Sequence, residues 1–376
     1  MDSWKGSLSA ESACAAVARG LGGRLGDAEI QVCPMADGGE GTLEIVAGQT
    51  QAERVERRVC GPFEGRALLA PFLWWPDRRE ALIEMAVCAG LPLLADEERD
   101  PLRTTTFGVG ELVRAALDLG AEKISLAVGG SATVDGGTGL AAALGWRLLD
   151  ATGHPLPPGG GGLAALDRIV PPEGCLRDGV VVEVWCDVTN PLLGEKGAAA
   201  IFGPQKGASP EDVLHLEAGL TRLAEVVARD VGVDLRDLSG GGAAGGLAAG
   251  AVAFLGASLV SGVEALMRMT RLEDRLRNAD WVVTGEGRFD RQSLEGKVVS
   301  GISGLARKTG TRVAVLAGSV SLPEAEWRGA GISAVEAANA AGRPLEEAMR
   351  RAESLAESAA ERLAESILNA NDVNHG

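Results

Sequence analysis

The chain of 376 residues is poor in the side chains that many hydrolases and zinc enzymes use. It has no tyrosine and only three histidines, His154, His215 and His375. A Ser-His-Asp triad, a His-ligated zinc or an H-E-x-x-H site would need more than these, because they stand in a glycine- and proline-rich loop, on a polar helix and in the C-terminal tail. We therefore expect chemistry that depends on carboxylates, lysines, hydroxyls and backbone amides.

Positive charge is also scarce. The formal net charge is -16, and the acidic side chains are spread along the chain. Neither a nucleic-acid backbone nor an anionic membrane is therefore expected as a partner. A small anionic substrate stays compatible with this composition wherever cations gather locally.

The cysteines form no C-x-x-C pair, and most stand in apolar or strand-like surroundings; they are Cys14, Cys33, Cys60, Cys88, Cys175 and Cys186. Free cysteines of this kind behave as small hydrophobic residues, which predicts a reducing, cytoplasmic location. No signal peptide is expected, because the apolar run 13–18 is short and bracketed by charges. The uncharged run 239–263 is diluted by glycine, so it predicts a glycine-rich loop leading into a buried helix and not a membrane span.

Strand-like and helix-like segments alternate through most of the chain, which predicts an α/β fold with parallel sheets covered by helices. The expected helices are 9–21, 43–48, 108–120, 137–145, 210–230, 298–310 and 345–367. The expected strands are 30–33, 55–60, 67–75, 80–87, 123–130, 180–188, 281–287, 312–320 and 332–339.

Glycine clusters that include an acid follow four of these strands: "MADGGEGT", "VGGSATVDGGTG", "CDVTNPLLGEKGA" and "TGEGRFD". Each one alone is explained by ordinary turn chemistry. Because ligands of open α/β sheets bind where the carboxyl ends of strands meet their loops, four such clusters together predict a binding site there.

Lysine usage adds to this pattern. Only six of the 36 cationic residues are lysines, and four of the six touch glycine: Lys5, Lys196, Lys206 and Lys297. An ammonium on a turn with open backbone N–H groups suits a phosphate. The chain has no Walker A loop, because Val298 follows the lysine of "SLEGKVVSG", and the one G-x-G-x-x-G match, at 240–245, follows a poor strand.

The segments "DSWKGSLSA", "MADGGEGT", "GGSATVDGGTG", "CDVTNPLLG", "FGPQKGA" and "VVTGEGRFDRQSLEGK" resemble, in order and over nearly the whole chain, the motifs of bacterial type I glycerate kinases. This resemblance implies phosphorylation of D-glycerate with ATP as co-substrate and Mg²⁺, with 2-phosphoglycerate favoured as product. It also implies two α/β domains, a Rossmann-like first domain with a parallel sheet and a mixed α/β domain inserted into it.

With the strand rhythm, the resemblance predicts that residues 1–62 and 279–376 form the Rossmann-like domain and residues 63–278 the inserted one. The sequence departs from the family pattern twice. Trp4 stands where the family usually has phenylalanine, and the strand that precedes the first motif in the family is expected to be missing, because Met1 comes directly before Asp2.

Site roles follow from these motifs. Asp187, which ends an apolar strand, is the predicted base or metal ligand, although a turn or helix-capping aspartate would look the same. Lys5 and Lys297 are predicted catalytic cations, and Glu286 and Asp290 metal ligands, for which turn and cap roles stay open. Predicted substrate- or phosphate-binding residues are Ser3, Ser7, Asp37, Gly38, Gly39, Thr105, Gly129, Gly130, Ser131, Thr133, Asn190 and Lys206.

Two other functions fit the pattern less well. A nicotinamide-dependent oxidoreductase of a small hydroxy acid would need a G-x-G-x-x-G directly after a strand. A non-catalytic sugar-acid-binding protein would share the pocket without the spaced acids. The expected partners are therefore the small molecules glycerate and ATP, and no pattern assigns an oligomeric state.

Overall fold

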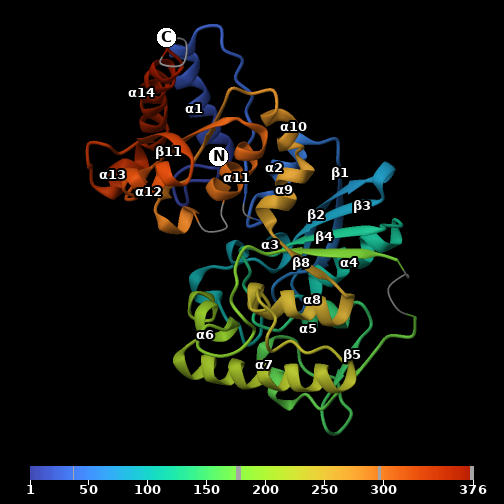
Figure 1. Ribbon diagram of the computed structural model, residues 1–376. Helices are drawn as coiled ribbons and strands as arrows, with labels where there is room; N and C mark the ends of the chain where they lie inside the picture. The colour runs from blue at the N-terminus through green and yellow to red at the C-terminus, as the bar shows by residue number, and fades with distance from the viewer. Residues whose placement is uncertain (37, 175–178, 295–297, 373–376) are drawn as a thin grey trace. The chain divides into compact units, whose positions relative to one another are not determined.

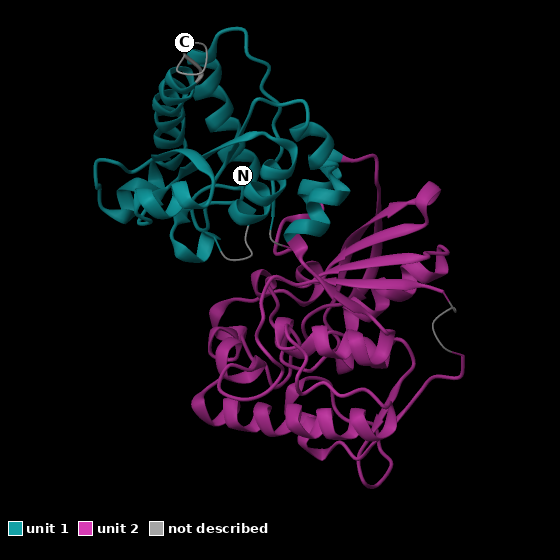
Figure 2. Ribbon diagram, in the orientation of Figure 1, with its two compact units in different colours: residues 1–37, 44–49, 263–376 teal, residues 38–43, 50–262 magenta. Residues whose placement is uncertain are grey.

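The computed structural model describes residues 1–36, 38–174, 179–294 and 298–372 (Figure 1). The chain divides into two compact units (Figure 2). Unit 1 consists of Met1–Asp37, Glu44–Gln49 and Val263–Gly376, and unit 2 of Gly38–Leu43 and Thr50–Gly262. The domain boundaries expected at 62/63 and 278/279 and the Rossmann-like, inserted arrangement stay predictions.

Unit 1 contains a sheet of three parallel strands in the order β13-β11-β9, and a second pair of parallel strands, β10 and β12. The strands are β9 (Trp281–Thr284), β10 (Arg288–Phe289), β11 (Arg312–Ala317), β12 (Ser319–Val320) and β13 (Ile332–Ala337). The helices are α1 (Ala10–Leu25), α10 (Leu272–Leu276), α11 (Val298–Thr309), α12 (Glu324–Gly329), α13 (Leu345–Arg350) and α14 (Ala352–Asp372).

Helices α1 and α14 pack closely against each other in unit 1. Helix α1 begins after Ser9, whose hydroxyl caps it by accepting a hydrogen bond from the Ser12 amide at 3.1 Å,. Gly20 faces α14 so tightly that a Cβ there would lie 2.2 Å from the Glu357 carbonyl oxygen. The contact buries small and branched side chains on both helices, including Ala13, Val17, Ala356, Ala360 and Leu363.

Unit 2 is built on a six-stranded mixed sheet in the order β1-β2-β3-β4-β7-β8, in which β1, β2 and β3 pair antiparallel and β3, β4, β7 and β8 pair parallel. Its strands are β1 (Glu53–Cys60), β2 (Ala67–Trp75), β3 (Glu80–Glu84), β4 (Lys123–Ala127), β5 (Arg147–Leu149), β6 (Arg168–Val170), β7 (Val181–Trp185) and β8 (Ser258–Val260). Its helices are α3 (Ala86–Ala89), α4 (Phe107–Asp118), α5 (Thr138–Ala143), α6 (Ala198–Phe202), α7 (Pro210–Asp230) and α8 (Leu247–Leu255), while α2 (Thr42–Gln49) and α9 (Gly262–Met269) each have residues in both units.

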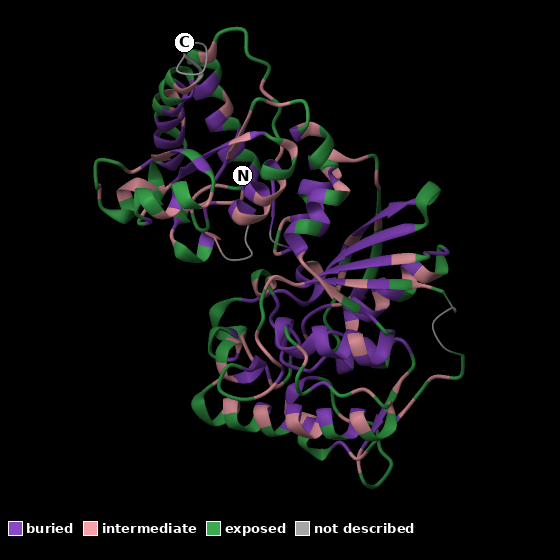
Figure 3. Ribbon diagram, in the orientation of Figure 1, coloured by how far each residue is buried: buried purple, intermediate pink, exposed green. Residues whose placement is uncertain are grey.

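The central strands of unit 2 are buried (Figure 3). Their apolar side chains share one core with α4 and α8, and a second core lies around α7; the first includes Phe72, Ile83, Leu126, Val184, Leu112 and Leu247, the second Leu163, Leu192, Leu216, Leu220 and Val227. All strand residues of β3 are buried, as are four of the five in β4. Near-continuous apolar runs such as these are typical of strands with both faces covered.

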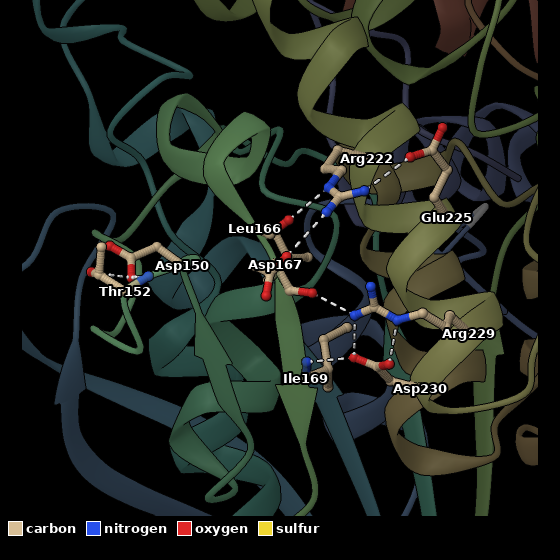
Figure 4. A network of polar contacts seen from close by, with 9 residues as sticks. All are labelled: Asp150, Thr152, Leu166, Asp167, Ile169, Arg222, Glu225, Arg229 and Asp230. Carbon is tan, nitrogen blue, oxygen red and sulfur yellow. Dashed lines mark hydrogen bonds and ion pairs between the residues drawn. The ribbon is translucent and has the colours of Figure 1, made fainter.

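Polar contacts fix α7 to the segment around β6 (Figure 4). Arg222 Nε donates to the Leu166 carbonyl oxygen at 2.7 Å, and the Ile169 amide donates to Asp230 Oδ2 at 2.8 Å. Arg229 pairs with Asp230 and also donates to the Asp167 carbonyl oxygen. These bonds tie both the middle and the end of the helix to the same connecting segment.

The expected α/β class is confirmed, with corrections in detail. The strand expected at 30–33 is wrong, since 28–36 is neither helix nor strand. The Met35 amide in this segment donates to the Met1 carbonyl oxygen at 2.9 Å. The pair β5–β6 and strand β8 are not anticipated by the sequence pattern. The run 239–263 forms a loop and the buried helix α8, and within the described part of the chain every helix is too short or too polar to cross a bilayer.

Candidate functional site

The carboxyl ends of the parallel strands of unit 2 bring together residues from distant parts of the sequence. Strand β3 ends at Glu84, β4 leads into Gly129, and β7 leads into Asp187. Because these strands run in the same direction and are neighbours, their ends share one edge of the sheet. This edge is the first candidate for a binding site.

Two glycine-rich turns meet at this edge. The Gly129 amide donates to the Gly38 carbonyl oxygen at 3.1 Å. A Cβ on Gly129 would lie 2.3 Å from the Cα of Gly39, so only glycine allows this approach,. Gly38 and Gly130 have φ of +82° and +71°, conformations that glycine adopts without strain. The structure thus brings together four of the glycines predicted from the sequence.

Glu84 is a buried carboxylate that the sequence analysis did not single out. Its Oε1 accepts a hydrogen bond from the Gly41 amide at 3.1 Å and its Oε2 one from the Leu43 amide at 2.9 Å. It therefore satisfies open N–H groups at the start of α2, where Gly41 has no side chain to do so,. The sequence signal that could have identified Glu84 is its position as an acid at the end of the apolar run in "EALIE".

Lys206 lies on a 3₁₀ turn, Pro204–Lys206, and is 1% exposed. Its Nζ donates to Ser131 Oγ at 2.8 Å and to the Thr133 carbonyl oxygen at 2.7 Å. Burial lowers the pKa of the ammonium to about 7, and the charge of Asp135 opposes part of that shift,. The ammonium expected among the phosphate-binding cations thus bonds to the glycine-rich turn itself.

Asp135, in the same turn, is the second acid that the sequence analysis did not single out. It is wholly buried and accepts hydrogen bonds from the amide and hydroxyl of Thr106, both at 2.8 Å, and from the amides of Gly137 and Gly139 at 3.1 and 3.2 Å. Burial raises the pKa of its carboxyl, and these hydrogen bonds act in the opposite direction. In the sequence, Asp135 is a single acid among glycines, and no local pattern indicates that four hydrogen-bond donors surround it.

Asp187 is half-buried just beyond β7. Its Oδ1 accepts hydrogen bonds from Ser261 Oγ at 2.7 Å and from the Gly262 amide, at the start of α9, at 3.1 Å. A helix-capping contact is therefore present, and it holds the carboxylate in a fixed direction. Gly38 lies beside the same helix start, since a Cβ there would be 3.6 Å from the Gly262 Cα.

Thr105 and Asn190 have other surroundings. Thr105 is buried, accepts a hydrogen bond from the Phe107 amide at 3.2 Å, and lines a separate pocket of about 460 Å³ together with Trp146. The Asn190 side chain donates to the Lys196 carbonyl oxygen at 2.8 Å, which closes the "NPLLGEK" loop. The Lys196 side chain is exposed.

A second candidate site is a pocket of about 760 Å³ in unit 1. Its polar lining residues include Asp2, Ser3, Lys5, Ser7, Glu286, Arg288, Asp290, Ser319, Ser321 and Asn339. Its apolar lining residues include Leu345, Ala348, Met349, Ala352 and Leu355 of α13 and α14. The structure therefore gathers five predicted site residues from both ends of the sequence around one cavity.

The turn that carries Lys5 is well defined. The Ser7 amide and hydroxyl both donate to the Trp4 carbonyl oxygen, at 2.8 and 2.9 Å, and Gly6 has a φ of +78°. Trp4 is 3% exposed and anchors this turn in the core of unit 1, while Lys5 is exposed on the pocket wall. A Cβ on Gly6 would lie 3.0 Å from Met349, so the polar turn and the apolar wall are in close proximity.

Glu286 and Asp290, the two predicted metal ligands, line this pocket together with a third acid, Asp2. Asp290 Oδ1 accepts from the Gln292 amide at 2.9 Å, and its Oδ2 is 3.3 Å from Arg288 Nε. The residues described here include no group of three or more His, Cys, Asp or Glu side chains arranged to hold a metal ion. Mg²⁺ in kinases is commonly held by one or two carboxylates together with substrate phosphates, so two carboxylates in a pocket with a lysine fit that donor set.

Two predicted site residues, Asp37 and Lys297, lie outside the described residues. Arg291, next to Asp290 in the chain, pairs with Glu326 at 2.8 Å and is exposed. Apart from Thr105 and Asn190, the remaining predicted residues lie either at the sheet edge of unit 2 or in the pocket of unit 1.

Comparison with known proteins identifies the family. Residues 1–368 match the sequence profile described as "Glycerate kinase family". The chain is 42% identical over 364 residues to a glycerate kinase of Halalkalibacterium halodurans, covering 96% of each chain. It is 43% identical over 355 residues to the glycerate 2-kinase of Escherichia coli K12, covering 93% of this chain and 92% of the relative.

A solved structure agrees. The putative glycerate kinase 2 of Salmonella typhimurium LT2 superimposes with a TM-score of 0.82 at 42% identity, over 99% of this chain and 97% of the other. Because both sequence and fold match over almost the full length, the chain belongs to the glycerate kinase family and is a kinase, a phosphotransferase that acts on an alcohol group.

Proposed function

We propose that this enzyme transfers the γ-phosphoryl group of ATP to D-glycerate in a Mg²⁺-dependent reaction and forms 2-phosphoglycerate. The observation that carries the proposal is the match to a glycerate 2-kinase at 43% identity over 93% of the chain. The lysine-bearing turn and paired acids of the unit 1 pocket support the phosphotransfer part independently.

ATP is proposed to bind in the unit 1 pocket. The wall of Leu345, Met349 and Leu355 offers apolar surface for the adenine ring, and Leu345 is 74% exposed although it is a large hydrophobic residue,. In the same pocket, Lys5 and the hydroxyls of Ser3 and Ser7 offer donors for phosphate oxygens,. A pocket that combines apolar surface with a lysine and hydroxyl donors suits a nucleotide.

Glu286 and Asp290 are the residues that would hold Mg²⁺ in this pocket, where the ion neutralises the charge of the phosphates,. Lys5 is proposed to stabilise the charge that develops on the transferred phosphoryl group. The resemblance assigns the same kind of role to Lys297, and a substrate-binding role to Asp37.

Asp187 is proposed to orient the glycerate hydroxyl and accept its proton. Its Oδ1 is held by Ser261 and Gly262, so the carboxylate is preorganised and needs no reorientation at the moment of reaction,. Gly129 and Gly130, with the hydroxyls of Ser131 and Thr133, are proposed to bind an anionic group of the substrate at the neighbouring turn. The enzyme is proposed to act in the cytoplasm on small molecules alone.

The test is an assay of ADP release from the purified chain with ATP, Mg²⁺ and D-glycerate. L-Glycerate and excess chelator serve as controls, and both should reduce the rate to background. Adding enolase without a phosphoglycerate mutase identifies the product, because enolase dehydrates 2-phosphoglycerate directly and does not act on 3-phosphoglycerate.

Other outcomes would favour the alternatives. Reduction of a nicotinamide cofactor by glycerate would indicate an oxidoreductase. Calorimetric binding of glycerate without ADP release would indicate a sugar-acid-binding protein. ADP release with a product on which enolase does not act would support a kinase whose product is 3-phosphoglycerate.

A further inference from the structure

Lys206 lies beside the glycine-rich turn that follows β4. Among the described cationic residues near this turn, its side chain is the most deeply buried. Its neighbour Gly207 has a φ of +97°, and a Cβ there would lie 2.3 Å from the Arg99 carbonyl oxygen. The 3₁₀ turn that carries Lys206 is therefore packed against a second segment, and from this turn the ammonium reaches Ser131 and Thr133. Its position is imposed by the fold.

The ammonium has no carboxylate partner at ion-pair distance among the described residues, and its two hydrogen bonds go to Ser131 Oγ and the Thr133 carbonyl oxygen. A buried charge without a carboxylate partner costs stability. An apolar side chain at this position would stabilise the fold more than a buried ammonium does. The presence of a lysine therefore indicates that its hydrogen bonds to the turn are needed.

That turn is fastened at several points. The Gly129 amide bonds to Gly38, the Ala132 amide to the Ala89 carbonyl at 2.8 Å, and Thr104 Oγ1 to the Ala132 carbonyl at 2.9 Å. Lys206 holds Ser131 and Thr133 from a segment more than 70 residues away in sequence. The Thr133 hydroxyl is buried and has no hydrogen-bond partner among the described residues, so one polar group of the turn is left for a ligand or a rearrangement.

We propose that Lys206 is a positioning residue of the phosphotransfer reaction, which holds the turn 129–133 in its substrate-binding conformation through Ser131 and Thr133 and does not contact the substrate. This rests on the proposed function, in which that turn binds an anionic group. A displacement of about 1 Å in a positioning element can cost about 100-fold in rate.

The experiment compares kcat/KM of the full-length wild type, Lys206→Met, Ser131→Ala and the double variant, each normalised to folded protein. Methionine keeps the length of the side chain and removes the donors. Lys308→Met, on an exposed lysine near the end of α11, is the matched control. We expect kcat/KM to fall about 10- to 100-fold in Lys206→Met and to stay unchanged in the control.

The double variant distinguishes positioning from direct contact. If Lys206 acts through Ser131, the loss in the double variant is smaller than the product of the two single losses, because the Lys206–Ser131 bond is removed in both,. Multiplying losses would show an independent contact with the substrate and would overturn the proposal. Hydrogen exchange provides a second readout: the amides of 129–133 should exchange faster in Lys206→Met than in the control.

Three results would refute the idea in different ways. If the wild type is active and Lys206→Met has the same kcat/KM, Lys206 has only a structural role. Unchanged amide exchange in a slow variant would remove positioning as the cause. No turnover in the wild type would refute the proposed function, and this inference with it.

Discussion

The buried ammonium of Lys206 makes the stability of the protein depend on pH in a predictable direction. Burial lowers its pKa from 10.5 to about 7. In the unfolded chain the side chain regains its ordinary pKa, so between pH 7 and 10.5 the unfolded state binds more protons than the folded state. The free energy of unfolding therefore rises with pH across this window, and the gain is lost as pH falls through the folded pKa.

The size of the effect follows from the two pKa values. With 10.5 unfolded and about 7 folded, linkage gives a penalty of about 4 kcal/mol at pH 7 and about 2 kcal/mol at pH 9,. Raising the pH from 7 to 9 should therefore stabilise the wild type by about 2 kcal/mol through this one group. The side chain is 1% exposed, so solvent screening does not reduce this figure much.

Asp135 acts with the opposite sign. Burial raises the pKa of its carboxyl, and an acid whose pKa is raised in the folded state makes the free energy of unfolding fall as pH rises,. Its charge also acts on Lys206, so the difference between wild type and Lys206→Met measures the lysine together with its interaction with Asp135. Urea unfolding at pH 7, 8 and 9 measures that difference, with Lys308→Met as the control. Parallel pH dependence of wild type and Lys206→Met would refute the reasoning that this ammonium is desolvated.

Three further predictions each concern one contact. Lys5→Ala should lower kcat/KM without changing the melting temperature, and the decrease should correspond to about 2 to 4 kcal/mol of lost transition-state stabilisation. Lys5→Arg should restore only part of kcat/KM. Wild-type kinetics in Lys5→Ala would show that Lys5 is an ordinary surface lysine. Gly20→Ala should cost about 1 to 3 kcal/mol in urea unfolding, because the new Cβ would lie 2.2 Å from the Glu357 carbonyl oxygen,; an equally stable variant would mean that α1 and α14 can separate freely. Asp187→Asn can still accept the Gly262 hydrogen bond but cannot take a proton, so kcat should fall about 100-fold or more at unchanged melting temperature; full activity would leave only the capping role.

The sequence by itself determined the elements whose signals are local. The capping box of Ser209 and Asp212 around Pro210 predicts the start of α7 at the residue where it occurs. The mostly apolar runs "KISLA" and "VVEVW" predict β4 and β7, because strands in the interior of a helix-covered parallel sheet favour apolar residues,. The lysine–glycine turn at Lys5 likewise stands before a helix, as the pattern indicates.

Long-range packing decided the rest. Glu84 and Asp135 are ordinary acids in the sequence, and their partners lie about 40 and 30 residues away, at Leu43 and Thr106,. Only the folded chain shows that Lys206 points inward to Ser131 while Lys5 stays exposed, although both are lysines next to glycine. Local pattern fixes the turn that each lysine occupies, but burial and hydrogen-bond partners depend on which distant segment packs against that turn, and this is set by tertiary structure alone.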